Sequence, residues 1–103
     1  MAKSKIPSHL SKEASLIFKN LSAEFGIDDS AGLRILRVAC EAFDRAQAAR
    51  EAIERDGLTV VDKAGQIKPH PLLPIERDSR AAFLAGLKAL NLSDWLKPGK
   101  PIF

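Results

Sequence analysis

Few side chains in this chain could act as nucleophiles, general bases or metal ligands. His9 lies close to the N-terminus and His70 lies between two prolines, so the spacing places neither beside a nucleophile or a second metal ligand. We expect His70 to stabilise the turn in which it lies and to cap the following helix. Cys40 is the single cysteine and lies in an apolar helical pattern, where a free thiol is usually a small buried hydrophobe. The sequence therefore predicts no catalytic site, no metal site and no cofactor.

Nucleotide-binding loops and catalytic carboxylate pairs are not indicated either. Gly57 and Gly65 are separated by a predicted hairpin, and the segment 98–101 lacks the preceding strand and the Ser or Thr of a phosphate-binding loop. Glu41 and Asp44 lie on a helix that is rich in arginine, where a solvated, ion-paired face explains them better than acid–base catalysis. The pattern argues against an ATPase.

Basic side chains offer a different chemistry, which is contact with phosphate groups. The net charge is +3, and the first twelve residues carry three lysines and no acid. Two arginines lie one turn apart near the start of the second predicted helix. The candidate phosphate contacts are Lys3, Lys5, Lys12, Lys19, Arg34 and Arg37. A solvated terminus without a partner explains the terminal lysines equally well, so both interpretations stay open.

Two helices are expected before the middle of the chain. Ser11 is a suitable N-cap for the first, which closes at Gly26. The turn and capping residues 28–30 then precede a second helix over 31–56. The pair loosely resembles a helix-turn-helix, but the turn is long and the second helix far exceeds a recognition helix. We therefore favour phosphate contact with modest base readout.

A small hairpin is expected after Gly57, where a β-prone run over 58–61 turns at 62–65 and returns through 66–68. The prolines on either side of His70 then impose an extended entry into a third helix, with Pro71 or Pro74 in its first turn.

The third helix is expected to be amphipathic and to end near Asn91, with Leu92 continuing the apolar contact and Ser93 capping a brief turn. Its expected apolar face consists of Ile75, Ala82, Phe83, Leu87 and Leu90.

The fold class predicted from these elements is mainly α: two long antiparallel helices, a small β-hairpin, then a third amphipathic helix. We expect a flexible basic arm over 1–9, a helical oligomerisation and DNA-recognition domain over 10–97, and a tail over 98–103. No apolar run approaches the ~18 residues of a membrane span, and the N-terminus lacks the apolar core of a signal peptide. These features favour an intracellular protein.

The second helix has more apolar surface than one partner helix needs. Small side chains allow close approach between helices, which suits packing between subunits. The expected oligomer interface consists of Ile35, Val38, Ala42, Ala49 and Ile53. The alternative is that all of this surface is intramolecular core.

The order of these elements resembles the phage terminase small subunit family. The matching segments cover roughly 10–92 and are Leu10 to Ala14, Val38 to Ile53, the hairpin between Gly57 and Gly65, Lys68 to Pro71, and the closing helix with Leu90 to Leu92. The family commonly continues with Leu-Gly-Leu-Thr-Pro, whereas this chain has Leu90-Asn91-Leu92-Ser93-Asp94. Asn can replace Gly at a left-handed helix cap, which preserves the fold expectation.

The resemblance implies a non-enzymatic protein that forms a ring-like homo-oligomer. It further implies recognition of double-stranded viral DNA at the packaging start site, and recruitment or regulation of the terminase large subunit, which holds the ATPase and nuclease. The implied location is the cytoplasm of the infected or lysogenic bacterial host, without membrane contact. Two alternatives remain: a helical protein-interaction module without DNA binding, and a small anion-binding enzyme that uses Arg34 and Arg37.

Overall fold

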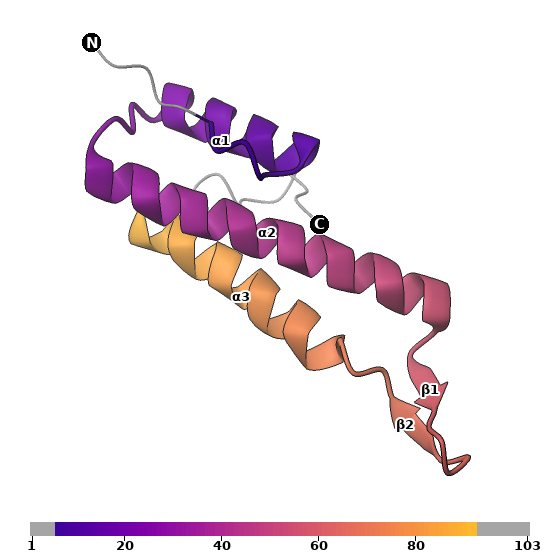
Figure 1. Cartoon of the computed structure of the whole chain (residues 1–103). Helices are drawn as coiled ribbons and strands as arrows, with labels where there is room; N and C mark the ends of the chain where they lie inside the picture. Colours follow the sequence, from indigo (N-terminus) through magenta and orange to yellow (C-terminus); the bar gives the residue numbers. More distant parts are fainter. Residues whose placement is uncertain (1–5, 93–103) are drawn as a thin grey trace.

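The computed structural model describes residues 6–92, and its elements follow the predicted order. The central helix α2 carries α1 and α3 on different sides, and both run antiparallel to it, while a two-stranded hairpin connects α2 to α3 (Figure 1). The elements are α1 (Lys12–Glu24), α2 (Ser30–Asp56), β1 (Thr59–Val61), β2 (Ile67–Pro69) and α3 (Leu73–Ala89). The mainly α fold class is confirmed.

The starts of α1 and α2 are fixed by side chains that the sequence offers as caps. The Ser11 hydroxyl accepts from the Ala14 backbone N–H over 3.1 Å, and a carboxylate oxygen of Asp29 accepts from the Gly32 N–H over 2.9 Å. Ser11 also donates its own backbone N–H to Asp44 over 2.8 Å, which attaches the start of α1 to α2. These bonds satisfy donors that the first turn leaves without helical partners.

The core lies on both flanks of α2. Phe18 and Leu21 bury the inner face of α1, while Phe83 and Leu87 bury that of α3. The rings of Phe43 and Phe83 meet with centroids 5.4 Å apart and planes tilted by 60°, a favourable aromatic geometry. Helices α1 and α3 of the same chain thus cover most of the apolar surface of α2.

Only some residues of the expected oligomer interface are exposed in the structure. Ala42, Ala49 and Ile53 are buried within the chain, so they cannot meet a partner without the helices separating. Val38 and Ile35 stay 50% and 37% exposed. A subunit contact through α2 is left with these two side chains, and it stays a prediction.

The buried face of α3 differs from the expected one. Ile75 and Ala82 are exposed, whereas Ser79 is buried beside Phe83 and Leu87. The inward stripe follows steps of four residues through these three positions, and the two misplaced residues lie on its flank. The expectation that Ile75 and Ala82 face the core was wrong because apolarity alone did not fix the rotation of the helix.

The end of α3 is a left-handed cap on Asn91, whose φ is 60°. The backbone N–H of Leu92 reaches back to the Leu87 carbonyl over 2.8 Å, and both side chains are buried. This bond and the apolar contact are those of a Schellman motif. The expected cap at Asn91 is confirmed, whereas the turn expected at Ser93 lies outside the described residues.

The hairpin projects from the end of α2, away from the loop that joins α1 to α2 (Figure 1). Its strands are antiparallel, with Thr59 opposite Pro69, Val60 opposite Lys68 and Val61 opposite Ile67. The Asp62 carboxylate accepts from the backbone N–H groups of Ala64 and Gln66, both over 2.9 Å, and Gly65 has a φ of 81°. The turn is therefore held by Asp62 and permitted by Gly65.

Candidate nucleic-acid interface

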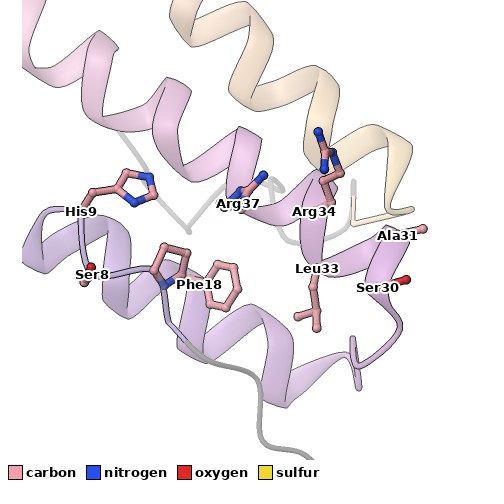
Figure 2. A pocket seen from close by; sticks show the side chains of 9 residues that line it. Ser8, His9, Phe18, Ser30, Ala31, Leu33, Arg34 and Arg37 are labelled. Carbon is pink, nitrogen blue, oxygen red and sulfur yellow. The ribbon is translucent and has the colours of Figure 1, made fainter.

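An open cavity of about 750 Å³ lies between the segment that precedes α1 and the first turns of α2. Figure 2 shows the side chains around it, which come from both segments and from α1. The lining residues are Pro7, Ser8, His9, Phe18, Ser30, Ala31, Leu33, Arg34 and Arg37. Two predicted phosphate contacts, Arg34 and Arg37, are thus brought together at one cavity.

Arg34 and Arg37 lie one turn apart on α2, and both line the cavity (Figure 2). Among residues 6–92 neither guanidinium has a salt bridge or a hydrogen bond. The Nε atom of Arg37 is buried and has no hydrogen-bond partner there. Because a guanidinium always carries its charge, this pair can accept an anion without first breaking an ion pair.

The N-terminal turn of α2 adds to the positive character of the cavity. Ser30 and Ala31, which begin that helix, both line the cavity. The first turn of a helix carries a partial positive charge, and its free N–H groups favour anions. One of these groups, the Gly32 N–H, is already bound by the Asp29 cap. The arginine side chains are therefore the main groups at this cavity that could bind an anion.

His9 forms part of the cavity wall, and its Nε2 lies 2.6 Å from Oε2 of Glu41 on α2. Leu10 beside it is buried, and its backbone N–H contacts the carbonyl of Pro7 over 3.4 Å. The part of the expected arm that the structure describes thus lies against α2. This pairing joins residues 32 positions apart, and nothing in the sequence spacing indicated it.

Two further predicted phosphate contacts, Lys12 and Lys19, do not line this cavity. Lys12 and Lys19 are exposed on α1, and their seven-residue spacing places them on one face of that helix. Lys3 and Lys5 lie outside the described residues, as does the tail over 98–103. The structure therefore joins Arg34 with Arg37 but does not bring all six basic residues together.

The helix-turn-helix comparison is not supported by the packing. In that motif the two helices meet at about 90–120°, whereas α1 and α2 run antiparallel (Figure 1). Arg34 and Arg37 therefore belong to the first turns of a long helix that packs antiparallel to α1.

Cys40 and His70 do not form a reactive cluster. Burial raises the pKa of the Cys40 thiol to about 12, with Asp44 and Glu41 adding to the effect, so the thiol is protonated at neutral pH. The buried His70 ring instead contacts Asp56 at the end of α2. Among residues 6–92, no group of three or more His, Cys, Asp or Glu side chains could hold a metal ion.

A helix must be both long and apolar to cross a bilayer. Within residues 6–92, none is both long and apolar enough to cross a membrane.

The described residues thus form a small helical body in which two arginines without ion pairs line an open cavity. The family model described as phage terminase, small subunit, matches residues 16–94, a span that includes the hairpin and nearly all of the three helices. The chain therefore belongs to the phage terminase small subunit family, as the resemblance predicted. No curated protein and no solved structure matches it.

Proposed function

We propose that this chain is a non-enzymatic, oligomeric adaptor that recognises viral DNA for packaging and recruits or regulates the terminase large subunit. Family membership supports the general role of a small terminase subunit. The observation that carries the DNA-binding part is the unpaired pair Arg34 and Arg37 beside the cavity. The proposal assigns these two guanidinium groups to phosphates of the DNA backbone.

Phosphate contact fits the chemistry of this pair. Arginine presents a planar fork of N–H donors that matches phosphate oxygens, and its charge persists at any physiological pH. Two such contacts per subunit are weak alone, but an oligomer that presents them repeatedly gains avidity. Lys12, Lys19 and the lysines before residue 6 would add contacts of the same kind.

The proposal also divides the roles between the two terminase subunits. The ATPase and nuclease chemistry belongs to the large subunit in this proposal, and the small subunit supplies binding in the cytoplasm of the bacterial host. Val38 and Ile35 are available on α2 for subunit contact.

A protein-interaction module without DNA binding is the second candidate. Three exposed apolar side chains on or beside the hairpin, Leu58, Val61 and Ile67, favour it. In that case Arg34 and Arg37 would have no role in binding nucleic acid.

The test is equilibrium binding to a labelled DNA duplex by fluorescence anisotropy over a range of salt concentrations. Arg34→Gln/Arg37→Gln should weaken binding and lower the slope of log K against log salt by about 1.8, because two phosphate contacts are lost. The control Arg77→Gln/Lys88→Gln removes the same charge from exposed positions on α3 and should leave the slope near that of the wild type. Equal slopes for both pairs would contradict the assignment, and no DNA binding by the wild type would favour the interaction module.

A further inference from the structure

The hairpin has one face that is apolar and uncovered. Directly opposed residues share a face, so Val61 and Ile67 lie together, and Thr59 and Pro69 extend the same face. Val61 and Ile67 are 68% and 73% exposed, and Leu58 just before β1, which strand alternation places on the opposite face, is 67% exposed. These are the most exposed large apolar side chains in residues 6–92. Such a concentration marks an interaction surface.

A partner that covers this face would stabilise the hairpin. Each strand has three residues, and a two-stranded hairpin of this size is marginal in water unless its apolar face is covered. None of the helices of the chain covers it, because the hairpin projects beyond the end of α2 (Figure 1). Within residues 6–92 this face is therefore open to a partner.

The opposite end of the molecule has complementary features. The loop between α1 and α2 exposes the apolar ring of Phe25 and carries Asp28 and Asp29. Glu24 ends α1 beside it, and no basic residue lies between 24 and 29. The hairpin carries Lys63, Lys68 and the single acid Asp62. Lys68 forms a salt bridge with Asp62 over 3.0 Å, so Lys63 is the basic side chain of the hairpin that faces a partner. The two ends of the chain thus match each other in both apolarity and charge.

We infer that the apolar face of the hairpin docks against the loop between α1 and α2 of a second copy of this chain. This inference deepens the proposed function and rests on its oligomeric part. A contact between two different surfaces is heterologous, and repeated head to tail it generates a closed ring when the rotation between copies permits. Lys63 faces the acidic residues Asp28 and Glu24 of the neighbour, while Val61 and Ile67 cover Phe25.

The first test is the solution mass by light scattering over a dilution series. Val61→Thr/Ile67→Thr keeps both positions β-branched, so the strands retain their propensity while the apolar face becomes polar. The concentration at which the oligomer dissociates should rise by at least about tenfold. The control Leu16→Gln/Ile75→Gln changes two exposed apolar residues on α1 and α3 and should leave that concentration unchanged.

The second test is chemical cross-linking of the variant Ala23→Cys/Ala64→Cys with a short bis-maleimide. Ala23 near the end of α1 and Ala64 in the turn of the hairpin are both exposed, and they lie near opposite ends of α2. The 27 residues of α2 span about 40 Å, so a short cross-linker cannot join the two cysteines within one chain. The native Cys40 is buried, with a pKa of about 12, and does not compete. Docking predicts a ladder of multimers for the double variant, and at most dimers when either cysteine is introduced alone.

The outcomes separate this inference from the proposed function. A wild type that is monomeric at every concentration overturns both the oligomeric adaptor and the docking. A wild-type oligomer that binds DNA, whose hairpin variant keeps its mass and whose double-cysteine variant gives no ladder, overturns the docking alone.

Discussion

The Nε2 of His70 donates a hydrogen bond to Oδ2 of Asp56 over 3.0 Å, and this bond joins the entry of α3 to the last residue of α2. The Nδ1 atom of the same ring accepts from the Leu72 N–H over 3.1 Å, which requires the neutral ring with its proton on Nε2. The His70 N–H also binds the Leu58 carbonyl over 2.8 Å. One buried histidine therefore holds both ends of the hairpin segment in place.

This link predicts an acid-dependent contribution from Asp56. A hydrogen bond from Arg55, followed by that from His70, lowers the pKa of the Asp56 carboxyl to about 2. Its folded pKa lies below its unfolded value of about 4, so the stabilisation is complete above about pH 4 and is lost as pH falls through about 2. Asp56→Asn should lower the melting temperature at pH 7, and its difference from the wild type should shrink between pH 4 and pH 2. Thermal melts followed by circular dichroism measure this difference in melting temperature, and Glu51→Gln is the control for net charge. A difference that does not change with pH would contradict the account.

Gly86 permits the close approach of α3 to α2. A Cβ built at Gly86 would lie 2.8 Å from the Cβ of Ala39, too close for two methyl groups. Gly86→Ala should therefore destabilise the fold by about 1–2 kcal/mol despite the better helix propensity of alanine. The double variant Ala39→Gly/Gly86→Ala removes the clash and should show a favourable coupling energy of about 1 kcal/mol in denaturant unfolding. A stabilised Gly86→Ala protein would show that the helices can move apart freely.

Asn91 adopts the left-handed conformation that ends α3, with a φ of 60°. Glycine reaches this conformation without steric cost, whereas a β-branched residue does not. Asn91→Gly should leave the free energy of unfolding within about 0.5 kcal/mol of the wild type, and Asn91→Val should lower it by about 1–2 kcal/mol. Urea unfolding of the two variants measures the difference, and equal stabilities would show that the cap does not constrain this residue.

The basic N-terminal region predicts a separate change in DNA binding. Lys3→Ala/Lys5→Ala/Lys12→Ala should weaken binding to duplex DNA and lower its salt slope by up to about 2.7 if all three lysines contact phosphates. Anisotropy titrations at several salt concentrations provide the measurement. An unchanged slope would remove these lysines from the mechanism and leave the contact to Arg34 and Arg37.

The sequence predicted the elements of this fold because their ends are encoded locally. Ser11 and Asp29 cap helices with their own side chains, and Gly57 and Asn91 end helices through positive φ values. Each of these signals depends on a few neighbouring residues. The order of the elements could therefore be deduced before any tertiary contact was known.

The parts that could not be predicted depend on contacts between distant segments. Ile75 is exposed and Ser79 is buried because the packing of α3 on α2 sets the rotation of the helix. Ala49 and Ile53, expected between subunits, are covered within the chain for a similar reason. A periodic pattern shows that a helix has an apolar face but not which neighbour covers it.

The candidate site was predicted in part. The spacing of Arg34 and Arg37 placed them on one side of α2, which follows from helix geometry alone. The cavity beside them and the pairing of His9 with Glu41 required the segment before α1 to return across α2. That return brings together residues far apart in the sequence, and no local signal encodes it.

The most direct test of the oligomeric DNA adaptor is the solution mass by light scattering, measured for the protein alone and with duplex DNA at low and moderate salt. The account predicts an oligomer that forms a complex with DNA and loses it as salt rises, because phosphate contacts release counterions. A monomer whose mass is unchanged by DNA at either salt concentration would contradict it.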